Sequence, residues 1–323
     1  MVNSAILFLM LCALSISTID KAKCQEIGGG KLRILSFQVT NCCRGVAILL
    51  IMLSHVSGTM GTVLLTPLGG TGVAMFLFLS GYGLNESYKK HGLTSYWQKK
   101  IKRVFIPYAI VITLLCVYHG KFDFLAYMLN ITGLKTSYWY IGFLMKWYIF
   151  YYLFTRFAMK YRMILMFICA IFILFLFPSI EAEQAFSFLC GVCTSIYIDS
   201  LRSVSFRKLI GLGIVALFIG ISFLAVKQLP YIRLHSVDWI YNVVQCGIKL
   251  PLGIAVMIGV TWMSWLSASR FLQLAGTLSY ELYLVHMPFY GEVHGMLLLA
   301  ILLFVGSFGV AFFFQRFNRK FVL

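Results

Sequence analysis

The stretch Arg44-Gly-Val-Ala-Ile-Leu-Leu-Ile-Met-Leu-Ser-His55 decides the fold. Nearly every residue between its two ionisable ends is apolar, and a helix that is apolar all round is buried in a large core or in a membrane. A rise of about 1.5 Å per residue places His55 roughly 16 Å from Arg44 along the helix axis. With Arg44 at the cytoplasmic mouth, we expect His55 near the middle of a hydrocarbon layer about 30 Å thick.

The rest of the chain has the same apolar character. Of its 323 residues, 61% are hydrophobic and 11% are charged, whereas a soluble domain carries about 25% charged residues. Lipid is the solvent that fits this composition. The sequence therefore predicts an all-α polytopic transmembrane bundle of about ten to eleven helices. The predicted apolar runs are residues 5–19, 45–64, 69–86, 104–118, 137–156, 163–178, 184–199, 209–226, 242–265, 272–290 and 296–314.

The net charge of +17 would also suit a nucleic-acid-binding protein, but the basic residues lie in short clusters between apolar runs. Most of them fall in alternate connecting segments, which the positive-inside rule assigns to the cytoplasm. The expected partners therefore include membrane lipids and exclude nucleic acid. The cysteines Cys190 and Cys193 lie inside a predicted helix, so we interpret them as small core residues and expect no metal site.

Two parts of the chain are distinguished. Residues 1–40 form an N-terminal extension whose apolar run, 5–19, is followed rather than preceded by lysines. This order favours a short helix with its N-terminus outside, and a cleaved leader is the alternative. Residues 41–323 form the membrane-embedded domain.

Ionisable groups at membrane depth are functional candidates, because they cost several kcal/mol unless they are paired or hydrated. His55 is the first of these. As a neutral imidazole it could act as a general base, or it could simply bond to a neighbouring helix. Glu281 lies in another predicted helix, and an ion pair with Lys146 or Lys249 is its expected structural role. The residues that could line a site are Gly72, Ser80, Tyr82, Lys146, Tyr280, Glu281 and His286.

Small residues and a basic cluster mark the next two segments. The run 69–83 is rich in glycine, and Gly72 and Ser80 share one helical face with Gly83. Such a face permits close packing against the His55 helix, or exposes backbone to a ligand. The basic cluster that follows suits phosphate groups, or equally the anionic headgroups of lipids. Its members are Lys99, Lys100, Lys102 and Arg103.

Four motifs along the chain resemble, in their order and spacing, the acyltransferase type 3 family of integral-membrane acyltransferases. They are Arg44 followed by ten residues and His55, Ser80-Gly81-Tyr82, the basic stretch from Arg103 to Ile106-Pro107-Tyr108, and Gly276-x-x-Ser279-Tyr280-x-x-Tyr283-x-x-His286. Two positions depart from the family pattern. Ala74 stands where an Asp is frequent, and Lys100 stands where Arg is frequent.

The resemblance implies a membrane-bound O-acyltransferase that binds no resident cofactor. It would use acyl-CoA, usually acetyl-CoA, on the cytoplasmic side and acylate a hydroxyl of an envelope polysaccharide or lipid-linked sugar in the bacterial inner membrane. By the same resemblance His55 is the catalytic histidine, Arg44 its partner near the donor, and Lys100 and Arg103 match the family's paired basic residues, which would hold the donor's phosphates. Lys99, in the same basic cluster, is expected to bind the donor with them. His55 would serve as general base or as transient acyl carrier. A transporter or flippase of lipid-linked sugars is the alternative.

Overall fold

A computed structural model describes residues 2–24, 34–120, 123–236 and 238–322. Within these ranges the chain is helical, with one isolated β-bridge between Ile19 and Ser269. The helices are α1 (Val2–Ser17), α3 (Phe37–Thr59), α4 (Thr66–His91), α5 (Tyr96–Lys100), the π-helical turn η2 (Ile101–Phe105), α6 (Ile106–His119), α7 (Phe124–Ile131), α8 (Trp139–Phe157), α9 (Arg162–Leu176), α10 (Ser179–Ala182), α11 (Ser187–Ile196), α12 (Ile198–Ser203), α13 (Phe206–Val226), α14 (Pro230–Leu234), α15 (Trp239–Trp262), α16 (Arg270–Thr277), α17 (Ser279–His286) and α18 (Leu297–Phe321), with short 3-10 turns at η1 (Val63–Leu65), η3 (Met159–Tyr161), η4 (Ser264–Ala268) and η5 (Tyr290–Val293).

The fold is that of a multi-pass membrane protein, as the sequence predicts. Among the described residues, seven helical segments are long and apolar enough to cross a membrane. They are Phe37–Thr59, Val63–His91, Tyr96–His119, Met159–Leu176, Phe206–Val226, Trp239–Trp262 and Leu297–Phe321. The predicted count of ten to eleven is not confirmed.

Four predicted runs are absent from these seven segments. The run 137–156 forms α8, which has 19 residues but carries Lys146, Arg156 and several tyrosines, and the other three form short or broken helices. The run 184–199 yields only the ten residues of α11, and ten helical residues span about 15 Å, half of the hydrocarbon layer. The run 272–290 is divided at Leu278 into α16 and α17, of eight residues each. The run 5–19 gives α1, with 16 residues. The apolar runs predicted where these segments lie, but the lengths of their helices depend on tertiary packing.

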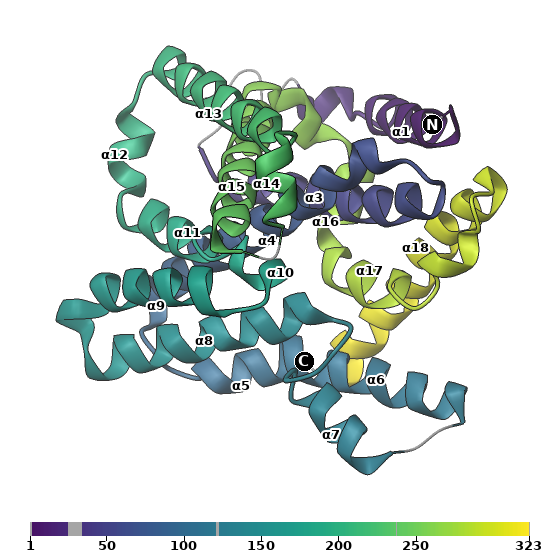
Figure 1. The fold of residues 1–323 in the computed structure, drawn as a ribbon, viewed down its shortest axis with the longest axis horizontal. Helices are drawn as coiled ribbons and strands as arrows, with labels where there is room; N and C mark the ends of the chain where they lie inside the picture. The colour runs from purple at the N-terminus through teal and green to yellow at the C-terminus, as the bar shows by residue number, and fades with distance from the viewer. Residues whose placement is uncertain (1, 25–33, 121–122, 237, 323) are drawn as a thin grey trace.

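Helix α3 lies at the centre of the bundle and contacts α4, α16 and α17. Its most apolar window is 78% buried, against 22% for α13 and α18, whose apolar surface is therefore left for lipid. Figure 1 shows α3 and α4 in the middle of the view, with α13 and α15 on one side and α1 and α18 on the other. The Arg44–His55 stretch is thus the core of the molecule.

Glycines let α4 and α16 approach α3 closely. A Cβ at Gly72 would lie 2.6 Å from the carbonyl oxygen of Ala47 and 2.8 Å from Cγ1 of Ile51. A Cβ at Gly276 would overlap the carbonyl oxygen of Asn41. The packing interpretation of the glycine-rich segment is therefore confirmed for Gly72, whose face is filled by α3.

The N-terminal helix α1 is tied to the domain at both ends. Near its start, the hydroxyl of Ser4 donates to Oγ1 of Thr62 at 3.0 Å. Beyond its end, Asp20 pairs with Arg270 at 3.0 Å. The hydrogen bond from Arg270 lowers the pKa of Asp20, so the pair is charged at neutral pH. Residues 25–33 of the predicted extension lie outside the described residues.

The expected ion pair between Glu281 and a membrane lysine is wrong. Lys146 pairs with Glu181 at 2.8 Å, and Lys249 pairs with Glu183. Both acids come from α10 and its C-cap, which contact α8 and α15. The apolar pattern placed these acids at a run boundary, and only the folded chain shows α10 packed between the two lysine-bearing helices.

Candidate functional site

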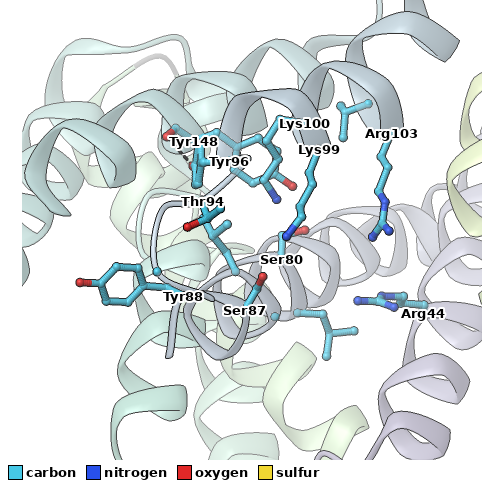
Figure 2. Close-up of a pocket in the computed structure, with 15 residues that line it drawn as sticks. Arg44, Ser80, Ser87, Tyr88, Thr94, Tyr96, Lys99, Lys100, Arg103 and Tyr148 are labelled. Carbon is cyan, nitrogen blue, oxygen red and sulfur yellow. Dashed lines mark hydrogen bonds between the residues drawn. The ribbon is translucent and has the colours of Figure 1, made fainter. Parts of the chain in front are cut away.

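A cavity of 290 Å³ opens among α3, α4, α5 and α8 (Figure 2). Its lining residues are Arg44, Leu79, Ser80, Gly83, Leu84, Ser87, Tyr88, Gly92, Thr94, Tyr96, Lys99, Lys100, Arg103, Val104 and Tyr148. Figure 2 shows Arg44, Lys99 and Arg103 directed toward the same space. The cavity therefore gathers the three residues predicted for donor binding, their arginine partner and Ser80, but not the predicted catalytic histidine.

Local structure holds these cations in place. Lys99 and Arg103 are four residues apart and so lie on one helical face. They flank the junction of α5 with the π-helical turn η2, a kind of insertion that is frequent at functional sites. Nζ of Lys100 lies 4.2 Å from the ring centroid of Tyr148, a cation–π distance. The hydroxyl of Tyr96 donates to the carbonyl of Tyr148 at 2.7 Å and joins α5 to α8.

A second cavity, of 410 Å³, adjoins the first and shares Arg44 and Arg103 with it. It is lined in addition by Phe37, Asn41, Lys102, Pro107, Gly276, Thr277, Ser279, Tyr280, Glu281, Gln315, Asn318 and Arg319. The hydroxyl of Tyr280 donates to the carbonyl of Val104 at 2.6 Å, which links α17 to η2. We call the end of the bundle that holds both cavities the basic face. Guanidinium and ammonium groups at this density suit a polyanionic phosphate ligand.

His55 lies far from the basic face along α3. It is four residues from the C-terminal end of α3 at Thr59, whereas Arg44 is seven residues from the start at Phe37. His55 therefore lies near the end of α3 that is opposite the basic face. The sequence suggested a position near the middle. The half-buried His55 ring faces His286, with Nδ1 of His55 3.1 Å from Nε2 of His286. The ring of Tyr290 lies 4.8 Å from that of His55 between centroids.

Buried aromatic rings fill the space between the basic face and the histidine pair. Tyr148 lines the first cavity. Tyr140, two turns earlier on α8, lies 5.3 Å from Tyr283 between ring centroids. Tyr283 in turn lies 5.9 Å from His286. Rings from α8 and α17 thus lie between the first cavity and the histidine pair.

The chain was compared with known protein families, curated proteins and solved structures. A sequence model described as an acyltransferase domain matches residues 40–315, most of the chain. The chain belongs to this acyltransferase family. No curated protein and no solved structure matches it. The acyltransferase is thus a multi-pass integral membrane protein, and its matched region contains most of α3, the first cavity, most of the second cavity and the histidine pair.

Four of the predicted lining residues, Gly72, Tyr82, Lys146 and His286, lie away from both cavities. Gly72 packs on α3. The hydroxyl of Tyr82 reaches the carbonyl of Leu35 at 3.5 Å, on a different face of α4 from Ser80. Lys146 is bound to Glu181. Tyr280 and Glu281 line the second cavity, and His286 contacts His55.

Some residues of the candidate site were not predicted from the sequence. Tyr148 is the clearest, because it lies two residues after Lys146 and on the face that reaches the cavity. Lys146 made this helix a candidate for the site, but a run that is apolar all round does not show which of its faces points inward. Tyr290 was also missed, since it follows the last predicted motif in the turn η5.

Proposed function

We propose that this acyltransferase moves an acyl group, most simply acetyl, from cytoplasmic acyl-CoA to a hydroxyl of an envelope polysaccharide or lipid-linked sugar in the bacterial inner membrane. One observation carries the proposal. A phosphate-compatible basic cavity and a histidine pair lie at different depths along the single central helix α3. A thioester donor with a charged head and a long neutral arm matches such a separation.

The basic face supports the choice of donor. Lys99, Lys100 and Arg103 converge on one cavity with Arg44. The phosphate groups of coenzyme A would meet this cluster, with arginine binding oxygen pairs and lysine acting as a point charge. The positive-inside rule assigns this face to the cytoplasm, where coenzyme A esters occur.

His55 supports the reaction. As the general base, it takes the proton of the acceptor hydroxyl while the oxygen attacks the thioester carbonyl. The C–O bond forms, the C–S bond breaks, and the proton passes from the imidazolium to the departing thiolate. A transient acyl-imidazole on His55 would give the same products in two steps. Water is a competing acceptor, and the apolar surroundings of α3 limit its access.

The test is release of free thiol from acetyl-CoA by membranes that contain the wild type or His55→Ala, followed by mass spectrometry of the surface glycans. We expect His55→Ala to insert and purify normally but to lose thiol release and glycan acylation. His119→Ala, at an exposed position at the end of α6, is the matched control and should keep both activities. Wild-type turnover in His55→Ala refutes the role of His55. A transporter or flippase would release no thiol in any variant.

A further inference from the structure

We propose that His286 is a positioning residue that fixes the tautomer of His55, so that Nε2 of His55 is the atom that receives the acceptor's proton. The inference rests on the proposed function and adds a second residue to it. It comes from two hydrogen bonds in series. Nδ1 of His286 lies 2.8 Å from the carbonyl oxygen of Leu282, and Nε2 of His286 lies 3.1 Å from Nδ1 of His55.

The first bond sets the tautomer of His286. A carbonyl oxygen only accepts hydrogen bonds, so Nδ1 of His286 must carry the hydrogen and donate it to Leu282. A neutral imidazole has one N–H, and its other nitrogen is an acceptor. Nε2 of His286 therefore presents a lone pair toward α3.

The second bond passes this choice to His55. Facing an acceptor at 3.1 Å, Nδ1 of His55 carries the hydrogen and donates it to Nε2 of His286. Nε2 of His55 is then left with the lone pair. A base oriented by a third group through its other ring nitrogen is the arrangement that enzymes use to activate a hydroxyl.

Burial assigns the two rings their different roles. His286 is 0% exposed, whereas His55 keeps partial exposure. Only His55 is thus reachable by an acceptor. The carbonyl of Leu284, beside His286 on α17, accepts from the hydroxyl of Tyr138 at 2.8 Å, which joins the end of α17 to α8. The helix that carries His286 is therefore held by α8 as well as by its contact with α3.

The activity test compares two substitutions of His286. His286→Gln keeps a side-chain oxygen that can accept from His55, whereas His286→Leu keeps an apolar body without an acceptor. In a serine protease, leaving the histidine base in the wrong tautomer lowers kcat by about 10⁴-fold. We expect His286→Leu to lower kcat by about 10²–10⁴-fold with the KM for acetyl-CoA unchanged, and His286→Gln to stay within about tenfold of the wild type. Equal losses in the two variants, or a rise in donor KM with unchanged kcat, would overturn the proposal.

A second measurement does not depend on activity. In protein labelled with ¹⁵N-histidine, the ring nitrogens report which of them carries hydrogen, and His55→Ala identifies the His55 signals by their loss. We expect His55 in the Nδ1–H form in the wild type and a shift toward Nε2–H in His286→Leu. An Nε2–H form in the wild type would end the proposal even if His55 is the base. Conversely, an active His55→Ala would remove the proposed function while leaving the tautomer result intact.

Discussion

Substituting Gly72 by alanine tests whether α3 and α4 are held together by the absence of one side chain. The new Cβ would lie 2.6 Å from the carbonyl oxygen of Ala47 and 2.8 Å from Cγ1 of Ile51, on the stretch between Arg44 and His55. Ordinary van der Waals contact begins at 3.4 Å, so the Cβ and the carbonyl oxygen of Ala47 would have to separate by 0.8 Å to reach it. The obstacle is main chain, which cannot rotate aside as a flexible side chain would.

Overpacking of this kind costs about 1–3 kcal/mol. We therefore expect Gly72→Ala to lower the Tm of the purified protein in detergent by several degrees. The matched control is Gly211→Ala on α13, where a Cβ would meet nothing within 4 Å. Alanine exceeds glycine in helix propensity by about 1 kcal/mol, so the control should be neutral or slightly stabilising. If the two variants shift Tm in the same direction and by the same amount, close contact at Gly72 does not stabilise the bundle.

Two further predictions concern charged residues. Replacing Lys100 or Arg103 by Glu should raise the apparent KM for acetyl-CoA at least tenfold, with a smaller effect on kcat. The reason is that a hydrogen bond to a charged group contributes about 1.5–3 kcal/mol. An unchanged donor KM in steady-state thiol release would mean that this cluster only anchors the membrane topology. Lys249→Met should destabilise the protein by about 3–5 kcal/mol in thermal unfolding, because Glu183 is left buried and unpaired. Adding Glu183→Leu should restore most of that loss, and a double variant as unstable as the single one would show that the pair itself stabilises the fold.

The sequence predicted the central helix because α3 combines the two strongest signals in the chain. Its apolar run identified a buried or membrane-spanning helix, and its two ionisable residues identified a site. The separation of Arg44 and His55 followed from helical rise alone. The position of His55 relative to the ends of α3 did not follow, because it depends on seven residues before Arg44 that the apolar run did not include.

Ion pairs and contacts between distant helices could not be predicted from the sequence, for a different reason. Glu181 and Glu183 lie at the boundary of a predicted run, and nothing local indicates that α10 folds back to meet α8 and α15. The same holds for the contact of His55 with His286, which joins residues 231 positions apart. The motif around His286 predicted that this residue matters, but only the folded chain shows that its partner is the other histidine.

Under the proposed function, the separation of Arg44 and His55 on α3 would let one helix serve a donor and an acceptor that approach from opposite sides. Arg44 faces the basic cavities, and His55 lies about 16 Å further along the same rigid rod. With the donor's phosphates held at the basic face, its thioester arm would have to extend along the row of Tyr140 and Tyr283 to reach His55. The acyl group would then cross most of the apolar layer as part of a bound donor, not as a free species. The acceptor would need to enter only as far as the last turn of α3, where the half-buried imidazole of His55 lies beside Tyr290. Since α3 is the most buried span of the bundle, packing fixes the separation of Arg44 and His55. The buried rings of Tyr140 and Tyr283 occupy the space between them, so the arm would reach His55 only if these side chains move aside.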